Sequence, residues 1–206
     1  MAGRVRIVFE EGGAVNRFVC NSKMNSIHEF TADLLSGDAV KLDNYAGKAV
    51  LIVNTASTTT RDFTQLNELV ERFPRDKFAV LGFPSNQFGK QENTRNEEIL
   101  NSLKYVRPGN GYEPNFDMFA KIEVNGANCH PLFDFLRRSL PTPSDDSYSL
   151  MSNPQFIVWS PVSRTDISWN FEKFLVDHEG RPIKRYSKEF ESKDIADDIE
   201  ELINKI

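Results

Sequence analysis

The chain has 206 residues, a length that suits one domain with a full hydrophobic core. Its formal net charge of −5 argues against sequence-independent nucleic-acid binding, which needs a dense basic surface. No apolar run approaches the ~18 residues of a transmembrane helix, and none follows the basic N-terminus as in a secretory signal. We therefore expect no membrane insertion.

The cysteine content favours a reducing compartment. The two cysteines, Cys20 and Cys129, are too few for a disulfide framework, so we expect a cytoplasmic protein in which each is a small buried hydrophobe. Cys129 precedes a predicted helix, a position that would lower the pKa of its thiol. Nothing in the sequence places it near the other candidate residues.

The chain reads as one domain without an internal linker or repeat. We expect residues 1–20 to form a flexible N-terminal arm and residues 21–206 a single domain. Residues 27–40 have the pattern of a hairpin. The continuous apolar run at 49–55 predicts a central strand covered on both faces, and apolar residues recur at helical spacing over 61–73.

The later elements follow the same alternation of strand and helix. Residues 171–176 and 182–186 flank a turn containing Gly180, which predicts a hairpin. We expect Ser192 or Asp194 to cap a closing helix. The other predicted elements are a buried strand at 77–84, helices at 97–105 and 131–140, and a short strand at 156–159. This order predicts an α/β protein of thioredoxin-like fold, with a central mixed β-sheet flanked by helices.

The loop between the first central strand and its helix is suited to an anionic nucleophile. It lies at a strand's carboxyl end and a helix N-terminus, where unpaired N–H groups and the helix dipole lower the pKa of an acidic group. The sequence there reads Ser57-Thr58-Thr59-Thr60. Threonine hydroxyls have a very high pKa and no reversible oxidation ladder, so we expect them to be polar loop residues or a helix cap.

Several long motifs carry a family resemblance. Residues 82–89 read Gly-Phe-Pro-Ser-Asn-Gln-Phe-Gly and residues 169–171 read Trp-Asn-Phe, with further matches at 105–109, 114–116 and 159–162. From about residue 27 to the end, the chain resembles the cytosolic, tetrameric, selenium-type glutathione peroxidases. The resemblance implies reduction of hydrogen peroxide and organic hydroperoxides with glutathione, as an antioxidant defence.

The resemblance also implies which residues form the site. Gln87, Trp169 and Asn170 match three members of the family's catalytic tetrad. The fourth, a selenocysteine, is expected between Ser57 and Thr59, where about three residues are missing from this chain. We expect no other cofactor, and the three histidines do not have metal-ligand spacing.

Basic residues are the expected ligands of glutathione, which carries two carboxylates. By local motif, Arg61 and Arg107 match the family's glutathione-contacting arginines, and Lys184 and Arg185, followed by Lys188, resemble its basic C-terminal cluster. A solvated basic patch is the plainer interpretation of that cluster. Residues 140–161 resemble the insertion that distinguishes tetrameric members, which implies a homotetramer.

Two interpretations of the missing residues stay open. A selenocysteine codon is a nominal stop codon, so a written translation can omit the residues around it from an otherwise ordinary peroxidase. Alternatively, the deletion is real, and the chain is a catalytically inactive thioredoxin-fold protein that binds glutathione or a protein partner.

Overall fold

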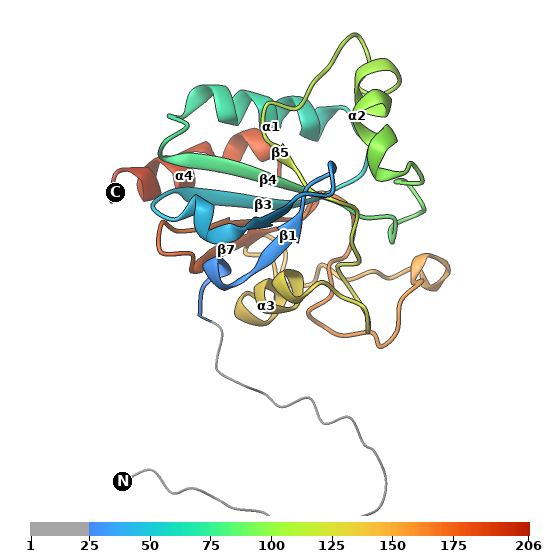
Figure 1. The fold of residues 1–206 in the computed structure, drawn as a ribbon. Helices are drawn as coiled ribbons and strands as arrows, with labels where there is room; N and C mark the ends of the chain where they lie inside the picture. The colour runs from blue at the N-terminus through green and yellow to red at the C-terminus, as the bar shows by residue number, and fades with distance from the viewer. Residues whose placement is uncertain (1–24) are drawn as a thin grey trace, which may run out of the picture.

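The computed structural model describes residues 25–206, which fold around a five-stranded mixed sheet (Figure 1). Its strand order is β5-β4-β3-β6-β7, with β3 and β4 parallel and β6 antiparallel to β3. The expected arm at 1–20 and Cys20 lie outside the described residues. The strands are β3 (Ala49–Thr55), β4 (Phe78–Pro84), β5 (Asp117–Met118), β6 (Lys173–Val176) and β7 (Pro182–Tyr186).

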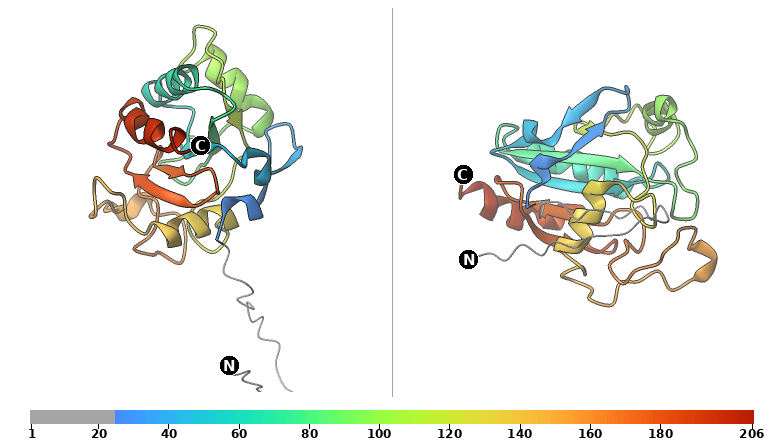
Figure 2. Two further views of the ribbon diagram at one scale, coloured as in Figure 1. Left: turned by 90° about the vertical axis from the view of Figure 1, so that its left-hand side faces the viewer. Right: turned by 60° about the horizontal axis from the view of Figure 1, so that its bottom comes forward.

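Helices cover both faces of this sheet (Figure 2). Helices α1 (Arg61–Arg72), α2 (Asn96–Tyr105) and α4 (Ala196–Ile203) contribute apolar side chains to one core cluster, and α3 (Pro131–Ser139) packs on the opposite face. All seven residues of β3 are buried, as its continuous apolar sequence predicts. The mixed-sheet prediction is therefore confirmed.

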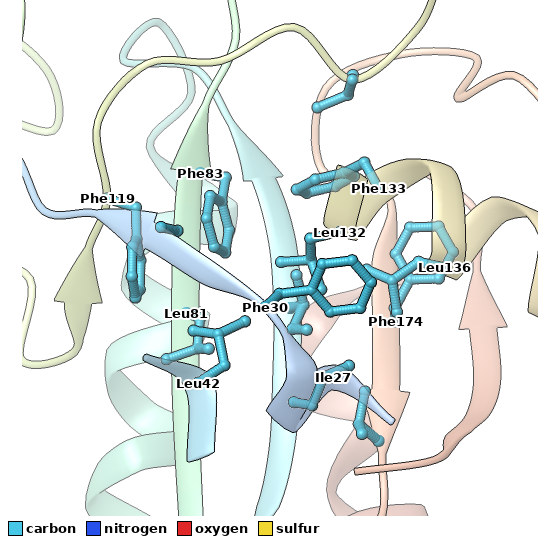
Figure 3. Packing of buried hydrophobic residues seen from close by; sticks show 14 of the residues in the cluster. Ile27, Phe30, Leu42, Leu81, Phe83, Phe119, Leu132, Phe133, Leu136 and Phe174 are labelled. Atoms are coloured by element: carbon cyan, nitrogen blue, oxygen red, sulfur yellow. The ribbon is translucent and has the colours of Figure 1, made fainter. Parts of the chain in front are cut away.

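Aromatic rings fill the α3 side of the sheet (Figure 3). Phe83 of β4 stacks on Phe119 with ring centroids 4.4 Å apart and meets Phe133 of α3 edge-on at 5.4 Å. Phe133 in turn contacts Phe174 of β6 at 6.3 Å. These four rings account for part of the chain's 16 phenylalanines, and each buries a large apolar surface.

Both predicted hairpins are present. Near the N-terminal end, β1 (Thr31–Asp33) and β2 (Ala39–Lys41) form a separate antiparallel pair after the short 3-10 helix η1 (Ile27–Glu29). A second 3-10 helix, η2 (Leu42–Tyr45), leads into β3. Strands β6 and β7 pair antiparallel with a register shift at Leu175 and Val176.

Two local predictions are wrong. The expected strand at 156–159 is absent: Phe156 ends the 3-10 helix η3 (Pro154–Phe156), in which Asn153 Oδ1 accepts from Gln155 N at 3.2 Å, and residues 157–159 have no regular structure. Neither Ser192 nor Asp194 caps α4. Residues Ser192–Ile195 form the 3-10 helix η4 ahead of it, and Ser192 Oγ bonds Asp62 at 3.3 Å.

Within residues 25–206, no helix has the length and apolar character needed to cross a membrane.

A buried lysine joins β6 to α1 and the segment after β7. Lys173 is fully buried, and its Nζ donates to the carbonyls of Phe190 at 2.5 Å and Ser187 at 3.3 Å. The carboxylate of Asp62 lies 3.7 Å from the same nitrogen. Burial lowers the pKa of Lys173 to about 8, and the nearby Asp62 charge only partly opposes this effect.

This depressed pKa predicts a pH-dependent stability. Between about pH 8 and pH 10 the folded protein binds fewer protons at Lys173 than the unfolded chain, so its free energy of unfolding rises with pH. Relative to K173M, the native chain should gain up to about 3 kcal/mol across this range, measured by urea unfolding at several pH values. The exposed control K205M should follow the native curve. Parallel curves for K173M and the native chain would contradict the prediction.

Candidate active site

The carboxyl ends of β3 and β4 lie side by side and carry the two loops that form the candidate site. Thr55 is opposite Pro84 in the parallel register, and Ser85 N donates to Thr55 O at 3.0 Å. Loop 56–60, which leads into α1, therefore begins next to the loop that follows β4. The two loops therefore share one edge of the sheet.

Glu92 and Arg107 hold the short loop in place. The buried carboxylate of Glu92 accepts from Ser57 N at 2.7 Å and from Ser57 Oγ at 3.0 Å. On the other side, Arg107 Nη1 donates to the carbonyl of Thr58 at 2.9 Å. Thr60 occupies the N-cap position of α1, but its side chain makes no capping bond, so of the two roles expected for the threonines it has that of a polar loop residue.

The Gln87 carboxamide is oriented by backbone groups on both sides. Its Oε1 accepts from Val124 N at 2.8 Å and Asn125 N at 3.0 Å, and its Nε2 donates to Asn125 O at 3.0 Å. A carboxamide nitrogen carries two hydrogens, so this set of bonds leaves one N–H for a further acceptor. A cavity of about 380 Å³ adjoins Gln87, lined also by Asn86, Lys121, Ile122, Glu123 and Val158.

Trp169 packs directly against the loop that follows Gln87. Its ring lies 6.0 Å from Phe88 and 5.4 Å from Phe156, measured between centroids. Gly89 has a φ of 60°, which favours glycine, and a Cβ added there would lie 3.2 Å from the indole, a tight contact that glycine avoids. Phe156 and Gly89 also line a cavity of about 190 Å³ beside the indole.

Asn54 attaches Trp169 and Asn170 to the end of β3. Its Nδ2 donates to Trp169 O and its Oδ1 accepts from Glu172 N, both at 3.0 Å. Next to it, Asn170 Nδ2 donates to Gln91 Oε1 at 2.9 Å. The Oδ1 atom of Asn170 is buried without a hydrogen-bond partner in the described part of the chain.

The structure thus brings Gln87, Trp169 and Asn170 together around the loops after β3 and β4. Amide and indole N–H groups near a helix N-terminus stabilise an anion. Ser57 and the three threonines of loop 56–60 do not supply an atom capable of reversible two-electron oxidation. The candidate site in this chain therefore has its donors but no redox-active atom.

Of the four expected glutathione ligands, two are exposed next to loop 56–60 and two lie on strand β7. Arg61 is half exposed with an ion pair to Asp62 at 3.4 Å, and Arg107 is exposed beside the loop. Lys184 lies on the α4 side of the sheet, where its Nζ is 2.7 Å from Asp198. Arg185 is only 1% exposed, so it does not offer its guanidinium to a dissolved tripeptide.

Arg185 is instead the centre of a buried network, and its assignment as a glutathione ligand needs correction. Its guanidinium pairs with the Glu172 carboxylate at 2.7 Å and donates to carbonyls of Leu140, Pro141, Thr165 and Asp166. Lys188 is the cluster member nearest the site, with Nζ 5.8 Å from the centre of the Trp169 ring. Alternation along β7 sends Lys184 and Arg185 to opposite faces, which a local motif does not reveal.

Sequence reasoning missed Asn54 and Glu92. A polar residue within the apolar run 49–55 was a usable signal for Asn54, since a buried amide needs partners. Glu92 had no comparable signal, because many loop carboxylates are exposed. In residues 25–206, no three His, Cys, Asp or Glu side chains are grouped so that they could hold a metal ion.

This fold defines a thioredoxin-like protein whose candidate site lies in the loops at the carboxyl ends of its central strands. The family model described as "Glutathione peroxidase" matches residues 27–137. The chain is 57% identical to glutathione peroxidase 1 of Rattus norvegicus, over 88% of this chain and 92% of the rat protein. It is 58% identical to glutathione peroxidase 2 of Sapajus apella, over 86% and 95%. The chain belongs to the glutathione peroxidase family.

A solved structure supports the same assignment. The crystal structure of Trgpx in apo form matches with a TM-score of 0.62 and 29% identity, over 88% of this chain and 98% of that one. The thioredoxin-like fold expected from the order of elements is therefore confirmed.

Cys129 does not have the reactive environment that its position before a helix suggests. Its Sγ donates to Val124 O at 3.0 Å and lies 3.5 Å from Arg137 Nη2. Burial raises the pKa of the thiol to about 11, and the Arg137 charge only partly offsets it. The expectation of a lowered pKa is wrong.

We predict that Cys129 in a C20S variant alkylates slowly in the folded protein. A rise from 9.0 to about 11 lowers the thiolate fraction at neutral pH about a hundredfold. Iodoacetamide labelling followed by mass spectrometry should be at least about tenfold slower at pH 7.5 than in urea-unfolded protein. Equal rates in the two states would contradict the raised pKa.

Proposed function

We propose that the natural protein reduces hydrogen peroxide and organic hydroperoxides with glutathione, through a selenocysteine between Ser57 and Thr59 that this chain lacks. Family membership supports the activity. The observation that carries the proposal is that the segments bearing Gln87, Trp169 and Asn170 meet at the carboxyl ends of β3 and β4, where loop 56–60 begins. The buried, unpaired Asn170 Oδ1 also fits a site that is missing a neighbour.

Gln87, Trp169 and the exposed basic residues each have a defined task in this proposal. A selenol or thiol in the loop supplies the reversible two-electron chemistry that an alcohol lacks. The free N–H of Gln87, the indole N–H of Trp169 and the α1 N-terminus stabilise its anionic form and keep it deprotonated. Arg61, Arg107 and Lys188 offer cations to the carboxylates of glutathione at the exposed rim.

A restored loop tests this proposal. The present chain should show no turnover of hydrogen peroxide with glutathione, because it has no nucleophile. A three-residue insertion between Ser57 and Thr58 with a central cysteine should raise turnover at least about tenfold over the present chain, measured by coupled NADPH oxidation. The matched insert with serine should stay at the level of the present chain. Activity in the serine insert, or none in the cysteine insert, would contradict the assignment.

The natural form of the loop requires a separate measurement. Peptide mapping across residues 49–73 of protein from its natural source should give a peptide heavier by the missing residues, with the isotope pattern of selenium. A peptide that runs from Ser57 to Thr58 without insertion would establish a real deletion. The inactive thioredoxin-fold protein that binds glutathione or a partner would then be the better description.

We also propose that the protein is a cytoplasmic homotetramer. Tyr148, Leu150, Val158 and Val162 are 90%, 50%, 58% and 60% exposed and lie in or next to the 140–161 segment. A concentration of uncovered apolar side chains of this kind is typical of a subunit interface.

Light scattering after size-exclusion chromatography tests the assembly. The native chain should have about four times its 23.5 kDa mass, and L150E/V162E should shift it to smaller species, because buried unpaired carboxylates oppose association. The control I206E alters an apolar residue that is 43% exposed at the C-terminus and should leave the mass unchanged. A monomeric native chain would contradict the proposal.

A further inference from the structure

Asn125 makes hydrogen bonds to both halves of the proposed site. It lies between β5 and α3 and is completely buried. Its backbone N–H and carbonyl bond the two ends of the Gln87 carboxamide, each at 3.0 Å. The orientation of Gln87, and so the direction of its remaining N–H, depends on where this peptide unit lies.

The side chain of Asn125 holds the segment that leads to Trp169. Its Nδ2 donates to Ile167 O and its Oδ1 accepts from Ile167 N, both at 2.9 Å. This two-bond pair fixes the backbone only two residues before Trp169. A single buried residue therefore connects the position of the Gln87 amide to that of the Trp169 indole.

A buried ion pair fixes which way the Asn125 amide points. Arg137 is 5% exposed, and its Nη1 lies 3.4 Å from Asn125 Oδ1 and in contact with the Asp166 carboxylate. Asp166 Oδ2 in turn accepts from Trp159 Nε1 at 2.8 Å. Donors therefore surround Asn125 Oδ1, while its Nδ2 faces a carbonyl.

Neither aspartate nor an apolar residue supplies this pattern at position 125. Aspartate would place a carboxylate oxygen against Ile167 O, and an apolar residue would leave both backbone groups of Ile167 buried and unpaired. We propose that Asn125 is a positioning residue of the peroxidase site, which sets the Gln87 and Trp169 donors at a fixed separation. The role in catalysis rests on the function proposed above.

Nuclear magnetic resonance on the present chain tests the connection without requiring activity. The probes are the Gln87 side-chain amide and the Trp169 indole N–H, assigned with Q87A, W169F and W159F. In N125D, which conserves size, both signals should move or broaden. The matched control is N67D, because Asn67 also makes three side-chain hydrogen bonds, to Tyr112, Glu113 and Asn115. It should leave both signals in place.

An unmoved Trp169 signal in N125D, or an equal change in N67D, would overturn the proposal. If N125D does not fold, N125S takes its place, since its smaller side chain cannot make the two-bond pair with Ile167.

Kinetics on the cysteine-inserted protein then test the consequence for catalysis. Displaced donors should lower the rate constant of the inserted thiol with hydrogen peroxide about tenfold in N125D. The rate constant for reduction by glutathione should change less than about twofold, because its carboxylates meet cations on other segments. Equal losses in both rate constants of N125D, or the same loss in N67D, would mean that Asn125 has a purely structural role. An inactive cysteine insert would refute the proposed function, while the resonance result would still decide the positioning.

Discussion

The arrangement of the site depends on the buried carboxamide of Asn54. This residue lies within a strand whose other side chains are nearly all apolar, and its two amide atoms bond the backbone of Trp169 and Glu172. Its own carbonyl accepts from Phe171 N at 2.7 Å, and Phe171 adopts a positive φ of 63° there. Such a backbone conformation is unfavourable for phenylalanine and persists only where neighbouring bonds determine it. The turn that presents Trp169 and Asn170 is therefore held by the strand that precedes the nucleophile loop.

The buried carboxylate of Glu172 supports the same turn through further hydrogen bonds. Glu172 accepts from Ser168 N and Oγ and forms the buried ion pair with Arg185. Arg185 donates to four carbonyls of the surrounding loops, so irregular backbone from residues 140–166 is satisfied by one guanidinium. Removing either partner of a buried pair leaves an uncompensated charge, which makes this network essential to local order.

The sequence was sufficient for the elements whose pattern is periodic. The two central strands, the four α-helices and both hairpins follow from apolar runs and turn residues, because burial on one or two faces dictates those patterns. The sequence was insufficient where contacts between distant segments determine the environment of a side chain. Arg185 and Lys184 are adjacent in the chain, yet the pleat of β7 separates a core guanidinium from an ammonium beside α4. Cys129 shows the same limit, since burial in tertiary structure outweighs the helix-start position that suggested a reactive thiol.

The anchors of loop 56–60 bear on where this loop can be lengthened. Glu92 accepts a hydrogen bond from Ser57 N, and Arg107 donates one to the carbonyl of Thr58. The two adjacent residues are therefore held by different segments of the fold. Strand β3 ends at Thr55 and α1 begins at Arg61, so the bond between Ser57 and Thr58 lies in neither element. Residues inserted at this bond would interrupt no strand or helix, and each neighbouring residue would keep its own anchor. The place proposed for the reactive group is thus one at which the chain can lengthen between two separately held residues.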